Sequence, residues 1–275
     1  MVSDMSGVKY QLTEMYRVLR RDNHVCIVVL DAVNYEVFRS LCMRLNLQGL
    51  TFVWSLGYDT PTWIRRTFIE SPEHIREVFS NVTYISANPW AHKFLPELRH
   101  VFKKVITLDT TFWDSELMTV KPESVTLVLK TRVIAGDRKI IAHYLQPHAP
   151  FTVVKYGNRI DIRNLKEPSI EYTLASKSFA WRSWFKKVYR LELANVLIHL
   201  FRKVIPWLRK HMYKVYVTAD HGEDFGSLYP SMLKRKNPKV LLRRIVLERH
   251  VGHAFDVPEL HLVPWIGLNT EYNEE

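Results

Sequence analysis

Short apolar runs alternate with helical patterns along this chain, and this alternation constrains its fold more than any other feature. Strand segments separated by helices are typical of a largely parallel sheet whose crossover helices pack on its faces. The predicted strands cover residues 25–30, 50–55, 82–86, 105–108, 140–145, 214–218 and 260–266. Helices are predicted over residues 35–45 and 73–80. We therefore expect an α/β fold, with a mostly parallel central sheet flanked by helices.

The segment between residues 169 and 211 is mostly helical in pattern, and we expect two helices there. Its apolar residues recur at helical spacing and are Trp184, Val188, Leu191, Val196, Leu200, Val204 and Leu208. Basic residues occupy the opposite positions. A helix lying on a membrane surface has a similar pattern, but a crossover helix packed on the sheet, with its basic face in water, is the simpler interpretation. No repeat or linker divides the chain, so we expect one domain over residues 1–275, with core motifs over 25–266.

The net charge of the chain favours anionic partners. The 275 residues carry a formal charge of +11, which raises the local concentration of anionic substrates, nucleic acids or acidic membrane surfaces without choosing among them. Only Cys26 and Cys42 are present, so neither a disulfide framework nor a thiolate metal site is indicated. Because the sequence shows neither an apolar stretch long enough to span a bilayer nor an N-terminal signal segment, we expect a cytoplasmic protein.

Carboxylates and an imidazole stand at the ends of two predicted strands. Asp31 follows the run over 25–30, and Asp220 and His221 follow the run over 214–218. The carboxyl ends of parallel strands meet at one edge of a sheet, where ligands of such folds bind. Oxygen and nitrogen ligands suit Zn²⁺, Mn²⁺ or Mg²⁺. A strand-end Asp is also a common helix N-cap, so a metal site and a structural role are both open for Asp31.

Hydroxyl and imidazole groups from other segments are expected at the same edge. Thr60 and Thr62 lie in the turn after the second predicted strand, although hydroxyls are also ordinary turn chemistry. His148 follows the strand over 140–145, and His253 stands shortly before the last strand. Either histidine could instead have a surface or structural role. Three further histidines near these motifs are expected to be structural or to support the ligands: His143, His250 and His261.

These motifs, and their order along the chain, resemble those of the alkaline phosphatase and sulfatase superfamily, including its sulfatase-like and PglZ-like metal-dependent hydrolases. Residues 28–32 (VVLDA) are similar to the family's first metal-ligand strand, and residues 146–151 (QPHAPF) to its Pro-His-x-Pro segment. Residues 218–223 (TADHGE) and 252–253 (GH), followed by VPW at 263–265, continue the match. Each motif alone is weak, but together they occur in the family's order and at strand ends. The resemblance implies an alkaline-phosphatase-like core.

The resemblance also implies a metal-dependent reaction at a threonine. Asp31, Asp220 and His221 would bind a divalent cation together with the oxygen of the nucleophile, for which Thr60 is our choice and Thr62 the alternative. Coordination favours the alkoxide form of a hydroxyl that is otherwise a poor nucleophile. Attack on phosphorus would form a phosphothreonine, which water then hydrolyses. The expected substrate is an anionic phosphate ester.

Other groups would support this reaction. By the same resemblance, His148 and His253 would hold the non-bridging oxygens and stabilise the charge that develops on them. Glu223 would orient His221 or a water molecule. Two-metal members of the superfamily usually have an Asp four residues before the middle His, whereas this chain has Tyr144 there. One metal site is therefore expected, as in lipoteichoic-acid-synthase-like phosphotransferases, and the pattern for a second site is incomplete.

Departures from the family pattern leave alternatives open. The Cys/Ser-x-Pro-x-Arg motif that carries the sulfatase nucleophile is missing, which disfavours sulfatase activity. Asn34 stands where related sequences have Arg, so a non-catalytic binding protein that retains the fold is a second interpretation. The basic segment over 234–244 favours a third, a nucleic-acid-acting phosphodiesterase, because phosphate contacts supply most non-specific nucleic-acid affinity. Our first expectation is a metal-dependent hydrolase or phosphotransferase acting on phosphate esters.

Overall fold

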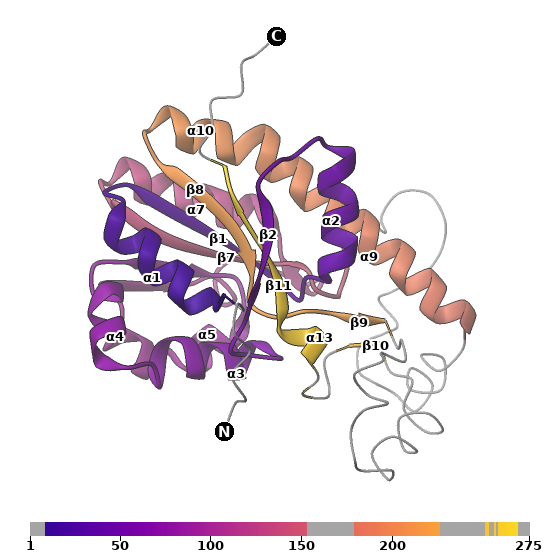
Figure 1. Cartoon of the computed structure of the whole chain (residues 1–275), viewed down its shortest axis with the longest axis horizontal. Coiled ribbons are helices and arrows are strands. Elements are labelled where there is room, and N and C mark those ends of the chain that lie inside the picture. Colours follow the sequence, from indigo (N-terminus) through magenta and orange to yellow (C-terminus); the bar gives the residue numbers. More distant parts are fainter. Residues whose placement is uncertain (1–8, 153–178, 226–250, 253–255, 257, 269–275) are drawn as a thin grey trace.

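A seven-stranded sheet forms the centre of the computed structural model, which describes residues 9–152, 179–225, 251–252, 256 and 258–268 (Figure 1). In spatial order the strands are β2 (Leu50–Trp54), β11 (Leu262–Gly267), β8 (Lys214–Ala219), β1 (Val25–Asp31), β7 (Lys139–Pro147), β3 (Thr83–Ser86) and β4 (Lys104–Thr107). β11 runs antiparallel to both of its neighbours, and the other pairings are parallel. The mostly parallel sheet predicted from the sequence is confirmed.

The strands that supply the candidate ligands lie at the middle of this sheet. β1 pairs with β8 on one side and with β7 on the other. Every residue of β1 is buried, and so is every residue of β8 after Lys214. A strand covered on both faces reads as a continuous apolar run, which is why these strands were evident in the sequence.

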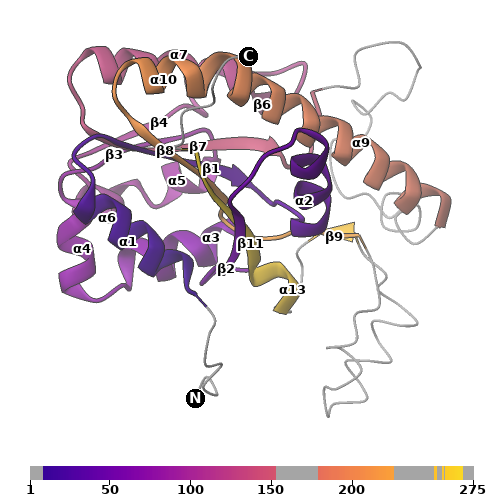
Figure 2. The same cartoon turned by 45° about the horizontal axis from the view of Figure 1, so that its top comes forward.

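Helices cover both faces of the sheet (Figure 2). One layer contains α2 (Tyr35–Arg44), α7 (Pro122–Ile134), α9 (Phe179–His199) and α10 (Ile205–Lys210), with the π-helical segment η4 (Leu200–Val204) between the last two. The opposite layer contains α1 (Gln11–Arg21), α3 (Thr60–Ile64), η1 (Arg65–Ile69), α4 (Glu73–Phe79), α5 (Pro89–Lys93) and α6 (Leu95–Arg99). Smaller elements are β5 (Trp113–Asp114), β6 (Thr119–Val120), β9 (Asp224–Phe225), β10 (Val251–Gly252) and α13 (Pro258–His261). The flanking helices predicted for the fold class are present.

The long helical segment is a crossover between β7 and β8 and packs on the sheet, as expected. Val188 and Val196 of α9 are buried, whereas Leu191, which was expected to share their face, is 54% exposed. The reason is that Glu192 and Leu193 turn towards the core at this point, and both are fully buried. Within the described residues, no helix has both the length and the apolar character needed to cross a bilayer.

Candidate active site

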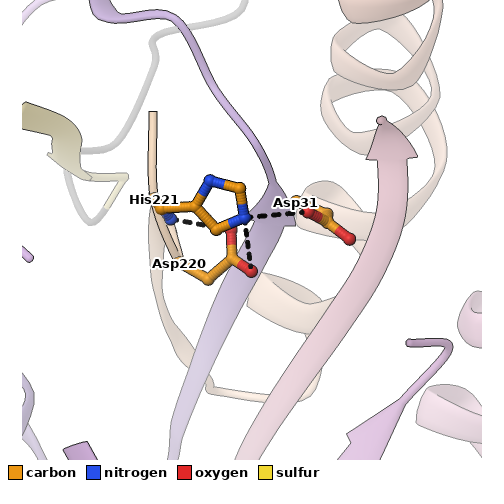
Figure 3. A group of neighbouring side chains, drawn as sticks. All are labelled: Asp31, Asp220 and His221. Carbon is orange, nitrogen blue, oxygen red and sulfur yellow. Dashed lines mark hydrogen bonds and ion pairs between the residues drawn. The ribbon is translucent and has the colours of Figure 1, made fainter. Parts of the chain in front are cut away.

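Three of the expected ligands meet at the carboxyl end of the two central strands. Asp31 is the last residue of β1, and Asp220 and His221 directly follow β8. Their ligand atoms all lie within 4.8 Å of one another, and the side chains point towards a common centre (Figure 3). All three residues are buried. Two carboxylates and one imidazole form a donor set that fits a divalent cation such as Zn²⁺ or Mn²⁺.

The electrostatics of this group also favour a cation. Nε2 of His221 lies 3.5 Å from Oδ1 of Asp31 and 3.6 Å from Oδ2 of Asp220. Burial lowers the pKa of His221, but the nearby Asp220 and Asp31 more than offset this and raise it to about 9. Burial likewise raises the pKa of Asp220, yet the positive charge of His221 brings it below its ordinary value. The two carboxylates thus stabilise a positive charge at this position, which the protonated His221 supplies here and a divalent cation would supply when bound.

Main-chain groups orient the ligands. Oδ1 of Asp220 accepts the N–H groups of Ala32 (3.0 Å) and His221 (2.7 Å), which leaves Oδ2 directed towards the centre. Nδ1 of His221 lies 2.8 Å from the carbonyl oxygen of Gly222, so its Nε2 faces the carboxylates. Glu223, which we expected in an orienting role, is buried, and its Oε1 accepts the N–H of Asp224 (3.1 Å). The orienting contact to His221 found here comes from the Gly222 carbonyl.

The hydroxyl of Thr60 lies within this group of ligands. Thr60 begins helix α3, whose N-cap Asp59 accepts the N–H of Thr62 (2.8 Å). Its Oγ1 donates a hydrogen bond to Oδ2 of Asp220 (2.7 Å) and is 3.4 Å from Nε2 of His221. Oγ1 is also 3.5 Å from Oδ1 of Asp31. The structure thus brings Thr60 to the three ligands, while Thr62 is half-buried and serves the helix cap through its backbone.

The turn before α3 is tied directly to the strand that carries Asp220. Ser55, at the end of β2, is buried and donates from Oγ to the carbonyl oxygen of Asp220, and the N–H of Gly57 donates to Ser55 Oγ (3.2 Å). A Cβ on Gly57 would lie 2.4 Å from the backbone nitrogen of Trp63. Glycine is therefore required where the turn passes the start of α3, and this close approach sets the position of Thr60.

Comparison with known proteins identifies the fold. No family model and no curated protein matches the sequence. Several solved structures are similar over most of the chain, among them three transferases. The soluble domain of lipooligosaccharide phosphoethanolamine transferase A from Neisseria meningitidis has 15% identity and a TM-score of 0.51, covering 90% of this chain and 77% of that one.

The other two structures are similar at a comparable level. The C-terminal periplasmic domain of phosphoethanolamine transferase EptC from Campylobacter jejuni has 13% identity and a TM-score of 0.50, covering 90% of this chain and 80% of that one. The phosphoglycerol transferase GacH from Streptococcus pyogenes, in complex with sn-glycerol-1-phosphate, has 11% identity and a TM-score of 0.50, covering 93% and 72%. The chain has an alkaline-phosphatase-like fold. At these identities the likeness shows the fold alone.

On this alkaline-phosphatase-like fold, Asn88 is a site residue that we did not expect. It caps α5, where its Oδ1 accepts the N–H of Trp90 (2.9 Å). Its Nδ2 donates to Oδ2 of Asp31 (2.6 Å) and lies 3.2 Å from Oγ1 of Thr60. In the sequence Asn88 follows the predicted strand over 82–86, where a site residue would be expected. It was not predicted because an amide is a weaker metal-ligand candidate than a carboxylate or an imidazole.

His143 also belongs to the surroundings of the site, in the supporting role that the sequence left open. It is fully buried in β7, and its Nδ1 lies 2.9 Å from the hydroxyl of Tyr84. Its Nε2 lies 3.5 Å from Oδ2 of Asp220 and makes no hydrogen bond. This contact with Asp220 places His143 directly behind one of the candidate metal ligands.

Of the two histidines proposed to bind substrate oxygens, His148 is the one within the described residues. His148 follows β7 and is half-buried; its Nδ1 contacts the carbonyl oxygen of Ala149, and it is not a member of the ligand group. The same loop is held by Glu192, which accepts the N–H and Oγ1–H of Thr152 (2.9 and 2.7 Å). His253 and the basic segment over 234–244 lie outside the described residues.

Proposed function

We propose that this protein is a metal-dependent enzyme that transfers or hydrolyses the phosphoryl group of phosphate esters, with Thr60 as the nucleophile. The observation that carries this proposal is the position of the Thr60 hydroxyl, within 3.5 Å of atoms of Asp31, Asp220 and His221. The oxygen of a nucleophile that is activated by a metal would occupy this position, in the middle of a buried cluster of potential metal ligands.

Asp31, Asp220 and His221 would hold the divalent cation, with one site expected. When bound, a Zn²⁺, Mn²⁺ or Mg²⁺ ion would lower the pKa of the nucleophile's hydroxyl and neutralise charge on the phosphate. The Thr60 hydroxyl already donates to Oδ2 of Asp220, so its oxygen lies beside a carboxylate oxygen that would bind the cation. Asn88 donates to both Asp31 and Thr60, which fixes Oγ1 in place.

The reaction would proceed in two displacements. A bond forms between Oγ1 of Thr60 and phosphorus, and the bond from phosphorus to the leaving alcohol breaks. The Thr60 proton passes to solvent, and the alcohol takes up a proton from solvent. Water or an acceptor hydroxyl then attacks the phosphothreonine and releases Thr60. We propose that His148 and His253 hold the non-bridging oxygens during these steps, since charge develops there. The similar solved structures are phosphoethanolamine and phosphoglycerol transferases, which supports transfer alongside hydrolysis.

The non-catalytic interpretation is weakened by what Asn34 does in the fold. Its Oδ1 accepts the N–H of Val37 (3.0 Å) as the N-cap of α2, and its Nδ2 donates to the carbonyl oxygen of Glu223 (2.9 Å). Asn34 thus connects α2 to the segment after β8 and has a structural role in this fold. Its presence in place of Arg therefore does not indicate that the site has lost its activity.

The test is hydrolysis of a nitrophenyl phosphate monoester, diester and sulfate by metal-stripped protein resupplied with Mn²⁺, Zn²⁺ or Mg²⁺. We expect metal-dependent turnover of at least one phosphate ester, little turnover of the sulfate, and loss of both metal binding and turnover in Asp220→Ala. Adding glycerol as an acceptor would distinguish transfer from hydrolysis. Stoichiometric metal binding without turnover of any ester or transfer to any acceptor would contradict the proposal.

A further inference from the structure

The outward side of helix α9 carries apolar side chains that the sheet does not bury. Leu191 is 54% exposed and Ile198 is 43% exposed. These residues are seven positions apart and therefore lie on one side of the helix. The exposed Lys187 is four residues before Leu191, and the exposed Arg202 is four residues after Ile198. Basic and apolar side chains thus follow one another along a single line on the outer surface.

Helix α7 extends this surface on the same side of the sheet. It lies against α9 and α10, because Oγ1 of Thr126 is 2.7 Å from Nε2 of His199 and the Lys130 ammonium lies 5.2 Å from the ring centre of Trp207. Its outward residues Leu127 and Ile134, also seven positions apart, are 58% and 75% exposed. We call the exposed side chains of α7, α9, η4 and α10 the outer helical face.

The charge of the outer helical face is almost entirely positive. Its exposed basic side chains are Lys186, Lys187, Arg202, Lys203 and Lys210. Among the residues of these helices, Glu123 is the only exposed acid, since Glu192 is fully buried and bonded to Thr152. No salt bridge is found for Lys187, Arg202 or Lys203 within the described part of the chain. These charges are therefore available to an anionic partner.

We infer that the outer helical face binds the surface of an anionic lipid bilayer. Lysines and arginines would contact acidic headgroups, while Leu191 and Ile198 enter the boundary between headgroups and acyl chains. A nucleic acid would use the charges equally well but gives no role to the exposed Leu and Ile side chains, because its backbone offers phosphates rather than apolar surface. Because basic and apolar side chains alternate along this face, it fits a lipid surface better than a nucleic acid.

The experiment is sedimentation of the full chain with vesicles of phosphatidylcholine, with and without phosphatidylglycerol. We expect binding to the anionic vesicles only, and weaker binding as the salt concentration rises. Leu191→Gln combined with Ile198→Gln is expected to lower the affinity roughly tenfold through lost apolar insertion. Arg202→Gln combined with Lys203→Gln is expected to lower it roughly tenfold or more through lost charge.

The matched control removes two charges from the opposite layer, through Arg76→Gln in α4 and Arg99→Gln in α6, both exposed. This variant has the same net charge as the Arg202/Lys203 variant and is expected to bind like the unmodified chain. Circular dichroism checks that each variant is folded. Absence of binding to anionic vesicles, or equal binding by all variants, would overturn the inference. Binding of duplex DNA that is lost in the Arg202/Lys203 variant but kept in the Leu191/Ile198 variant, without vesicle binding, would reassign the face to nucleic acid.

Discussion

The hydroxyl of Thr60 donates a 2.7 Å hydrogen bond to the carboxylate of Asp220, although the two residues are 160 positions apart in the sequence. Thr60 begins helix α3, on the opposite face of the sheet from α9, and Asp220 follows the central strand β8. Their contact joins the proposed nucleophile to a proposed metal ligand.

Replacement of Thr60 distinguishes the proposed nucleophile from its neighbour. Thr60→Ala is expected to keep the fold and bind the cation, but to lower turnover by at least about 10³-fold. Thr62→Ala is the matched control and is expected to have near-normal turnover, since its backbone rather than its hydroxyl supports the helix cap. Steady-state kinetics and metal titration measure both effects. Normal turnover in Thr60→Ala together with a defect in Thr62→Ala would reverse the assignment.

Asn88 combines a helix cap with contacts to the site, and substitution separates these roles. Asn88→Ser retains an N-cap oxygen for α5 but removes the amide that reaches Asp31 and Thr60. We expect little change in melting temperature and about a 10- to 100-fold loss of metal affinity or turnover. Asn88→Ala loses both roles and should also be less stable, by about 1 kcal/mol. Equal activity of Asn88→Ser and the unmodified chain would show that Asn88 is a cap alone.

His143 is expected to act through Asp220. In His143→Leu, the Asp220 carboxylate loses the neighbouring imidazole, and we expect metal affinity to fall about 10- to 100-fold. Tyr84→Phe removes only the hydroxyl 2.9 Å from Nδ1 of His143 and is expected to have a smaller effect in the same direction. Calorimetric titration with Mn²⁺ or Zn²⁺ measures both. Unchanged affinity in His143→Leu would restrict this residue to packing in the core.

Gly57→Ala tests the turn that positions the nucleophile. Because its Cβ would lie 2.4 Å from a backbone atom of Trp63, the turn or the start of α3 must shift. We expect turnover to fall by more than about 10²-fold, since a displacement near 1 Å has effects of that size on reactions that depend on alignment. Unfolding measurements show how far the substitution lowers the stability of the fold, for comparison with its effect on turnover. A loss of stability without a loss of turnover in the remaining folded protein would contradict this role.

Asp22 gives a prediction for stability at low pH, away from the site. Its hydrogen bond from Arg21 (2.7 Å) lowers its pKa from 3.8 to about 2 against the effect of burial, with a further contact from Lys214 (2.8 Å). A carboxyl whose pKa is lower in the folded state stabilises the fold above its unfolded pKa. This stabilisation is lost as the pH falls from about 4 to about 2.

We expect Asp22→Asn to be less stable than the unmodified chain by about 1–2 kcal/mol near pH 7, because the half-exposed Arg21 is partly screened by solvent. This difference should diminish as the pH falls from about 4 to about 2. Urea unfolding across this pH range measures it. A difference that stays constant from pH 7 to pH 2 would show that the ionised carboxylate is not what stabilises the fold.

The sequence predicted the central strands and the ligands at their ends because both depend on local patterns. β1 and β8 are buried on both faces, so they read as apolar runs, and a polar residue directly after such a run is evident. The antiparallel direction of β11 was not predictable in this way, because an apolar run indicates burial but not which strand lies beside it. Helix α3 was read as a turn because it has only five residues and because its N-cap Asp59 and its second residue Pro61 are both common in turns.

The central place of β1 has a consequence for how the molecule is assembled. Both strands that flank it, β7 and β8, come more than a hundred residues later in the chain. Asp31 therefore remains apart from Asp220 and His221 until the most distant strand pairing of the sheet centre has closed, a step that costs loop entropy before it gains contacts. The three side chains meet only in a molecule whose central strands have paired. The cation would therefore bind late in folding, after these strands are in place, and would not initiate folding.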